Sequence, residues 1–226
     1  MEEPKVKTGI PELDDLIGGG FVNPSVILLL GQPGSGKTNF SLKYLFEGVK
    51  HNERGIFFST LSESSSSLIE FGSNFYFFNS KMIGRKIFVI DLSNKIEEFK
   101  KSQQFLDEIT EKIEKFNISR MVIDPINPIN LALPDIKEYR MFLFKFARII
   151  KEFKIQALIT AELYDFNYLH CHEAYISDGT ILLDKIFKQK KMVREMTIVK
   201  MRGTAHRLDP IEYTFTKHGM TLNLKK

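Results

Sequence analysis

The sequence has little of what secreted and membrane proteins use. Among its 226 residues there is one cysteine, Cys171, so no disulfide can form within the chain. The uninterrupted apolar runs are short, such as residues 26–30, whereas a membrane-spanning helix needs about 20 apolar residues. The first five residues are Met-Glu-Glu-Pro-Lys, and no apolar stretch follows them, which argues against a secretory signal. We therefore expect a cytoplasmic protein with no membrane contact.

Tryptophan is absent as well, and the aromatic residues are 20 Phe and 7 Tyr. Hydrophobic residues make up 43% of the chain and charged residues 27%, a balance typical of globular proteins and not of disordered ones. The net charge of +4 is spread along the chain. It permits contact with nucleotides or nucleic acid but does not require it. Because no linker divides the sequence, we expect a single domain over residues 1–226.

Short apolar segments alternate with longer amphipathic ones. The expected strands of the first part are residues 26–30, 56–60, 87–92, 121–123 and 156–161, and the expected helices are residues 37–50, 68–78, 96–116 and 139–153. Strands that alternate with helices predict right-handed parallel crossovers and an α/β fold with a mostly parallel sheet. The tail differs, since residues 180–183, 195–201, 212–216 and 220–224 resemble strands joined by short turns. We expect them to form an antiparallel extension on one edge of that sheet.

The strongest motif is at residues 31–38, Gly-Gln-Pro-Gly-Ser-Gly-Lys-Thr, which has the spacing of a phosphate-binding P-loop. A predicted strand precedes it and a predicted helix follows. The glycines allow backbone amides to converge on an anion at the N-terminus of the helix. A lysine here is expected on the β- and γ-phosphates, and the following hydroxyl on Mg²⁺. The expected nucleotide-binding residues are Gly31, Pro33, Gly34, Ser35, Gly36, Lys37, Thr38 and Asn39. The motif predicts binding but not hydrolysis.

A second acidic position completes this pattern. Asp124 ends the apolar run 121–123, and Pro125 stops the strand behind it. P-loop enzymes need such an acid to hold Mg²⁺, so we expect Thr38 and Asp124 to share the metal. The alternative is an ordinary strand-end aspartate that begins a turn. Thr160 and Glu162 end the fifth predicted strand, where polar residues can sense a γ-phosphate.

Taken together, these motifs resemble the KaiC-like branch of the RecA-superfamily ATPases over nearly the whole chain. Residues 8–16 and the glycines at 18–20 are similar to the first motif of that branch, and the P-loop and Asp124 follow in order. Residues 177–179 and 200–206 are similar to its late motifs. The resemblance implies a RecA-like core, ATP binding and frequent assembly into hexameric rings that hold nucleotide between subunits.

The resemblance also implies roles for residues outside the P-loop. Glu63 matches one of two adjacent glutamates that polarise the attacking water, and Ser62 replaces the other. Lys200 and Arg202 match residues that reach the γ-phosphate of a neighbouring subunit, and His206 matches a nucleotide contact. Other readings stay open: Ser62 and Glu63 can simply begin a helix, and charges on an edge strand can serve against aggregation.

Two further segments have weaker signals. Residues 170–173, His-Cys-His-Glu, are too close together to converge on one tetrahedral metal ion, so we expect no metal there. They follow the fifth strand, where RecA-type proteins often contact DNA, but residues 162–175 contain no Lys or Arg to attract phosphate. The basic residues between 185 and 194 are a nearby source of positive charge. The Phe-rich stretch at residues 71–78 indicates core or interface rather than a ligand site.

Three functions fit these observations. The first is a homo-oligomeric ATPase that uses Mg²⁺ and ATP to drive or gate the interaction with an unknown protein partner. The second is a recombinase-like ATPase that binds DNA. The third is a nucleotide-gated regulator with little hydrolysis, which Ser62 favours because one acid of the family pattern is missing.

Overall fold

The computed structural model describes residues 4–61, 65–96, 101–163 and 171–224. Its helices are α1 (Pro11–Leu16), α2 (Lys37–Lys50), α3 (Ser65–Gly72), α4 (Ser93–Ile96), α5 (Ser102–Phe116), α6 (Asn127–Ala132), α7 (Ile136–Glu152) and α8 (Glu173–Ile176), with a 3-10 turn at Ser80–Met82. Its strands are β1 (Lys5–Val6), β2 (Phe21–Val22), β3 (Ser25–Gly31), β4 (Gly55–Ser59), β5 (Ile87–Asp91), β6 (Arg120–Asp124), β7 (Gln156–Glu162), β8 (Gly179–Lys188), β9 (Lys191–Met201), β10 (Ile211–Thr216) and β11 (Gly219–Leu222). No helix in these ranges has the length and apolar character needed to cross a bilayer.

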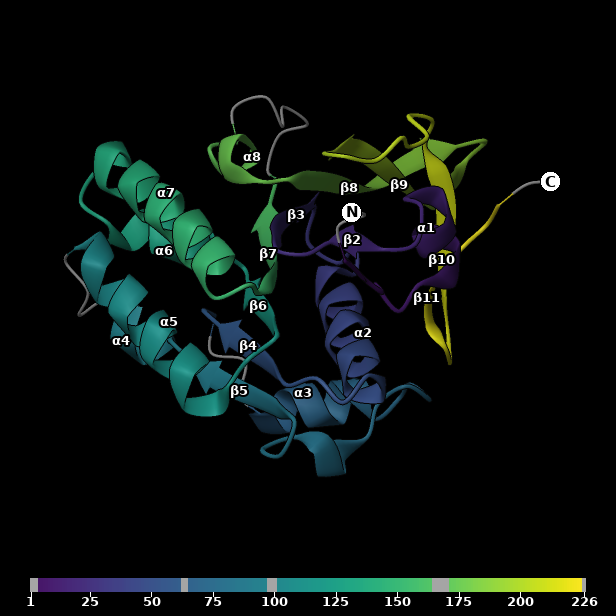
Figure 1. Ribbon diagram of the computed structural model, residues 1–226. Helices are drawn as coiled ribbons and strands as arrows, with labels where there is room; N and C mark the ends of the chain where they lie inside the picture. The colour runs from purple at the N-terminus through teal and green to yellow at the C-terminus, as the bar shows by residue number, and fades with distance from the viewer. Residues whose placement is uncertain (1–3, 62–64, 97–100, 164–170, 225–226) are drawn as a thin grey trace.

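One large sheet organises the molecule (Figure 1). Its strand order is β11-β10-β9-β8-β3-β7-β6-β4-β5, and the strands from β8 to β5 are parallel. Beyond β8, the strands β9, β10 and β11 are each antiparallel to the strand before. This arrangement confirms the predicted α/β fold with a mostly parallel sheet and an antiparallel extension on one edge.

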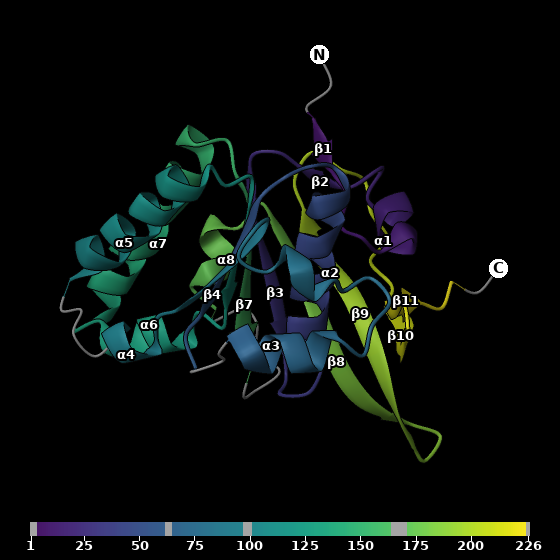
Figure 2. The ribbon, with the colours of Figure 1, turned by 90° about the horizontal axis from the view of Figure 1, so that it is seen from below.

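Helices cover both faces of the sheet (Figure 2). The helices α5 and α7 pack on one face, and α1 and α2 pack on the other. The central strand β3 serves both cores, because Val26, Leu28 and Leu30 belong to one cluster and Ile27 and Leu29 to the other. A strand with apolar residues on both faces has no alternating pattern, as the sequence showed.

The β3–α2 unit holds the P-loop between its two elements. The helix α2 spans Lys37–Lys50, the range predicted from the sequence. Gly36 precedes it with φ +98°, a left-handed conformation that favours glycine. The strand β3 lies between β7 and β8, so the P-loop leaves the carboxyl edge of the parallel strands between these two neighbours. Crevices outside the carboxyl ends of parallel strands are the usual ligand sites in α/β folds.

Two predicted helices differ from the structure. The helix expected at residues 68–78 spans Ser65–Gly72, because Phe77 and Phe78 turn back and pack on Phe46 of α2. The Phe46–Phe78 ring centroids are 4.6 Å apart, and this contact replaces further helical turns. The helix expected at residues 96–116 is two helices, α4 and α5, and residues 97–100 between them lie outside the described ranges.

The first two tail strands are longer than predicted, and the last, β11, is one residue shorter. The strand β8 continues to Lys188, and β9 begins at Lys191. Gln189 and Lys190 form the turn between them, with φ angles of 49° and 63°. Turns of this kind normally contain Gly or Asn, so the sequence had no turn signal there. The result is a long β8–β9 hairpin that projects away from the rest of the sheet (Figure 2). The strands β10 and β11 are joined by a short turn at residues 217–218, since Thr216 pairs with Gly219 across it.

Candidate functional site

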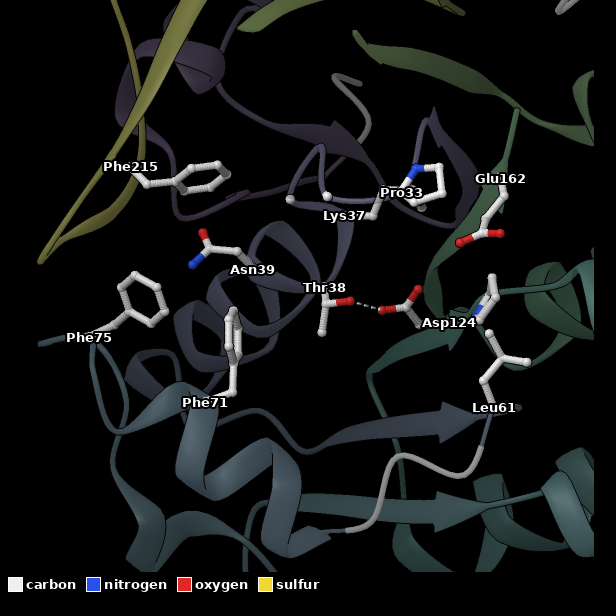
Figure 3. A pocket seen from close by; sticks show the side chains of 13 residues that line it. Pro33, Lys37, Thr38, Asn39, Leu61, Phe71, Phe75, Asp124, Glu162 and Phe215 are labelled. Carbon is white, nitrogen blue, oxygen red and sulfur yellow. Dashed lines mark hydrogen bonds between the residues drawn. The ribbon is translucent and has the colours of Figure 1, made fainter. Parts of the chain in front are cut away.

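A cavity of about 490 Å³ opens at the carboxyl edge of the parallel strands (Figure 3). The P-loop and the start of α2 form one wall, and the ends of β6 and β7 form another. Aromatic residues close the remaining side. The lining residues are Pro33, Gly34, Gly36, Lys37, Thr38, Asn39, Leu61, Phe71, Phe75, Asp124, Pro125, Glu162 and Phe215. Six of the eight expected nucleotide-binding residues are in this set, and Gly31 and Ser35 lie directly behind it in the loop.

The P-loop is packed tightly against the strand beside it. A Cβ added to Gly31 would lie 2.5 Å from the carbonyl oxygen of Leu183 on β8. The loop closes on itself through a hydrogen bond from the Ser35 amide to the Gln32 carbonyl, 3.1 Å long. The loop therefore has a fixed shape at the N-terminus of α2, where the helix dipole and the backbone amides favour an anion.

Side chains hold several carbonyl oxygens of the loop. The ammonium of Lys37 donates to the carbonyls of Gly31 at 2.9 Å and Gln32 at 3.2 Å. The hydroxyl of Tyr213 on β10 donates to the Ser35 carbonyl at 2.6 Å. Burial lowers the pKa of Lys37, while the carboxylates of Glu162 and Asp124 act in the opposite direction. The Lys37 ammonium therefore lies beside the loop that is expected to bind phosphate.

Thr38 and Asp124 meet as the motif predicts. The Thr38 hydroxyl donates to Oδ2 of Asp124 at 2.8 Å (Figure 3). The Thr160 hydroxyl on β7 donates to Oδ1 of the same carboxylate. Burial raises the pKa of Asp124, and the hydrogen bonds from Thr160 and Thr38 and the charge of Lys37 oppose this rise. A hydroxyl and a carboxylate held together are oxygen ligands of the type that Mg²⁺ prefers. The donor set therefore fits a magnesium ion.

A second carboxylate lies at the end of β7. Glu162 lines the cavity near Asp124 and Lys37 (Figure 3). The side chain of Asn127 on α6 fixes this strand end, since its Oδ1 accepts from the Glu162 amide at 2.8 Å and its Nδ2 donates to the Glu162 carbonyl at 3.4 Å. The sequence marked Glu162, with Thr160, as a polar strand end that can sense a γ-phosphate, and the fold adds that it lines the cavity beside Lys37.

The far side of the cavity is aromatic. Phe71 and Phe75, with ring centroids 5.6 Å apart, face Phe215 of β10 across the opening (Figure 3). The guanidinium of Arg194 lies 5.2 Å from the Phe215 ring. The amide of Asn39 is buried; its Oδ1 accepts from Met220, and its Nδ2 has no hydrogen-bond partner within the described part of the chain. Flat apolar walls with one spare donor suit a purine base.

The structure divides residues 71–78, which the sequence indicated as core or interface: Phe71 and Phe75 line the cavity, and Phe77 and Phe78 pack against the core. The helix α3 ends at Gly72, and the chain then turns so that Phe75 reaches the cavity while Phe77 and Phe78 pack against the core. The sequence reasoning did not single out Phe215. It belongs to an antiparallel strand whose contact with the P-loop depends on the tertiary fold.

Lys200, Arg202 and His206 do not lie at this cavity. Lys200 pairs with Thr180 near the start of β8, whereas the P-loop leaves β3 at the level of Leu183. Its ammonium donates to the carbonyls of Ala174 and Ser177 at 3.2 and 2.5 Å. Arg202 donates to Asp178 at 3.1 Å. These cations are thus near the amino ends of the parallel strands, whereas the P-loop of their own chain is at the carboxyl ends.

His206 is in the same late segment, and its ring contacts the Arg207 carbonyl at 3.3 Å. Glu63, the expected base, and Ser62 lie outside the described residues, as do residues 164–170 of the segment expected near DNA. Of residues 170–173, the described part contains Glu173, which is buried and accepts from Cys171 Sγ at 2.8 Å and from the Tyr139 hydroxyl. Within the described ranges no three His, Cys, Asp or Glu side chains form a group that could hold a metal.

Comparison with known proteins places this geometry in a family. The family model of the KaiC ATPases matches residues 6–226. The circadian clock oscillator protein KaiC of Parathermosynechococcus lividus is 29% identical over 229 residues, which are 97% of this chain and 42% of that protein. A UPF0273 protein of Methanopyrus kandleri is 25% identical over 250 residues, covering 100% of this chain and 94% of that protein.

A solved structure agrees with the fold. The crystal structure of a KaiC-like protein from the archaeon Pyrococcus horikoshii superposes with a TM-score of 0.86 at 29% identity, covering 99% of this chain and 100% of that one. The chain spans less than half the length of the clock protein that it matches. It has the P-loop, the acid at the end of β6 and the late motif in the predicted order. The chain belongs to the KaiC family of ATPases.

Proposed function

We propose that this chain is a Mg²⁺-dependent cytoplasmic ATPase, and that residues 1–226 act as one domain. It binds ATP in the P-loop cavity, hydrolyses it between copies of a homo-oligomer and so gates the binding of a protein partner. The observation that carries the proposal is the Thr38–Asp124 hydrogen bond of 2.8 Å beside the Lys37 ammonium. A hydroxyl, a carboxylate and an ammonium at one P-loop are the groups that a metal-bound triphosphate requires.

The cavity suggests how ATP lies in it. The phosphates rest on the P-loop, with Lys37 turned from its carbonyl contacts to the β- and γ-phosphates. Thr38 and Asp124 would hold Mg²⁺, which neutralises charge between the phosphates when it is bound. The base lies against Phe71, Phe75 and Phe215, and the spare Nδ2 donor of Asn39 faces its ring nitrogens.

The positions of Lys200 and Arg202 support hydrolysis between copies. Both lie near the edge of the sheet away from their own P-loop, so neither can act on the nucleotide of the same chain. In a head-to-tail assembly this edge of one copy would meet the cavity of the next, and such contacts close into rings when the rotation allows. A hexamer is the ring that the family resemblance implies, and His206 would approach the nucleotide from the same segment.

Hydrolysis also needs a group that orients water. We propose Glu63 for this role, since it follows β4 next to Leu61, which lines the cavity. The replacement of the neighbouring acid by Ser62 favours slow turnover, and it keeps a nucleotide-gated regulator as the second candidate function. The DNA-binding alternative has less support, because residues 162–175 carry no Lys or Arg.

Phosphate release from Mg-ATP tests the proposal. We expect release to rise more than linearly with protein concentration, because each site needs two copies, and Lys37→Ala to abolish it. The matched control is Lys191→Ala, which removes the same charge at the tip of the β8–β9 hairpin. Tight ATP binding without release would select the regulator instead. No binding of ATP by the unmodified protein would overturn both.

A further inference from the structure

One cation at the P-loop belongs to neither the motif nor the late segment. Lys185 of β8 donates from Nζ to the carbonyl oxygen of Pro33 at 2.6 Å. With Lys37 on Gly31 and Gln32 and Tyr213 on Ser35, four carbonyls of the loop are held by side chains. A carbonyl held on the outside of a loop keeps the loop's amides free to turn inward, which is how such loops bind anions.

The register of β8 explains why Lys185 reaches the loop. Leu183 pairs with Gly31, the last residue of β3, so β8 continues past the level where the P-loop begins. Side chains two apart on a strand share a face. Leu183 faces the core that contains α2, and Lys185 therefore lies on the same face, beside the loop. Its ammonium is 3.6 Å from the position that a Cβ of Gly34 would occupy.

The partner of Lys185 across the hairpin is also a cation. Lys185 is directly opposite Arg194 in the β8–β9 register. Like charges in directly opposite positions of an antiparallel pair destabilise it. Arg194 lies over the Phe215 ring that lines the cavity, and Lys185 lies at the P-loop, which this ring approaches at Gly36. A phosphate bound on the P-loop would add negative charge beside Lys185 and so reduce the repulsion between the two cations.

We propose that Lys185 is a positioning residue of the phosphate cradle: it holds the Pro33 carbonyl outward and adds positive charge beside Gly34 within the same chain. The inference rests on the proposed ATP binding at this loop. It differs from the role of Lys200 and Arg202, which need a second copy. A single copy thus has two ammonium groups at the P-loop, Lys37 from the motif and Lys185 from the hairpin.

Calorimetric titration of Mg-ATP and Mg-ADP tests the role of Lys185. We expect Lys185→Met to weaken binding of both nucleotides about tenfold, the effect of one lost charge-assisted contact. Lys185→Arg, which keeps the charge and the donor, should restore binding to within about threefold. The affinity of the unmodified protein should also fall more steeply with salt than that of Lys185→Met, because the variant has one cation fewer at the phosphates. A merely structural role would not change this salt slope.

The control is Lys191→Met, which removes the same charge from the same hairpin but pairs with Lys188 at the tip. We expect it to bind like the unmodified protein. Binding by Lys185→Met within twofold of the unmodified protein, or an equal loss in Lys191→Met, overturns the inference and leaves ATP binding intact. No binding by the unmodified protein overturns the proposed function instead. If Lys185→Met does not fold, Lys185→Gln, which keeps a donor without charge, is titrated in its place with the same expected loss.

Discussion

Gly36 shows how closely the cavity is built around single residues. Its φ is +98°, and a Cβ there would lie 2.1 Å from Cζ of Phe215. We expect Gly36→Ala to lower the free energy of unfolding by about 2 kcal/mol or more, because alanine is strained at this φ and the Phe215 ring must move as well. Mg-ATP binding should be lost, since both the start of α2 and the aromatic wall change. Urea unfolding and calorimetry measure the two effects.

Gly84 supplies a matched control for this substitution. It has a similar left-handed φ of +77°, but nothing lies within 4 Å of an added Cβ. Gly84→Ala should therefore lose only the backbone contribution, about 1 kcal/mol, and should keep Mg-ATP binding. Equal stability losses in the two variants, with binding retained in Gly36→Ala, would contradict the close contact with Phe215.

The residues of the phosphate end were predictable because they are near one another in sequence. The motif at residues 31–38 dictates loop shape, and the structure brings Thr38 to Asp124 as expected. The aromatic end was not predictable. Phe71, Phe75 and Phe215 come from α3, the turn after it and β10, and only the complete sheet brings them to one cavity. Lys185 had appeared as part of a basic run, and its role depends on the register of β8 with β3.

At the scale of elements, β9 ends far from the P-loop of its own chain. Its late cations, Lys200 and Arg202, therefore lie away from the cavity of that chain. Arg202 follows β9 and is held by Asp178, whose other oxygen accepts from the Val26 amide at 3.0 Å at the start of β3. We expect Arg202→Ala to bind Mg-ATP like the unmodified protein while its phosphate release falls at least tenfold, because the lost charge acts on the neighbour's nucleotide.

Mixing variants tests whether this action crosses between copies. In a mixture of Arg202→Ala with Lys37→Ala, some interfaces combine an intact P-loop with an intact Arg202. We expect such mixtures to release more phosphate than the sum of the two variants alone. If the mixture shows no recovery although both variants form mixed oligomers, Arg202 does not act in trans.

Most elements followed from local pattern, and the exceptions have tertiary causes. The range of α2 and the places of β3 to β7 matched because their apolar runs and helix boundaries are encoded locally. The helix α3 is shorter than predicted because Phe78 packs on Gly72 and Phe46. Hydrophobic periodicity does not predict such a tertiary contact. The β8–β9 hairpin is longer than predicted because its turn, Gln189 and Lys190, contains no turn-forming residue.

For the molecule as a whole, three buried tyrosines determine how stability responds to alkaline pH. Burial raises the pKa of the hydroxyls of Tyr44, Tyr139 and Tyr213 in the folded chain. An unfolded tyrosine has a pKa of about 10. The folded chain thus retains more protons above pH 10, and stability that is fully present below this value is lost as the pH rises. Urea unfolding at pH 8, 9.5 and 11 should show a steep loss only at the last.

Buried lysines change stability with pH in the opposite direction, and they therefore determine the pH at which the loss of stability should begin. Burial lowers the pKa of Lys43 in the folded chain, whereas an unfolded lysine has a pKa of about 10.5. Between these two values the unfolded chain binds more protons, so stability rises with pH. Above that point the tyrosines still contribute, together with the Cys171 thiol, whose pKa burial also raises, and the net slope is negative. Because the chain has no Trp, tyrosinate absorbance reports ionisation directly. Tyr213→Phe should make the loss shallower, and full ionisation of all tyrosines near pH 10 without unfolding would contradict their burial.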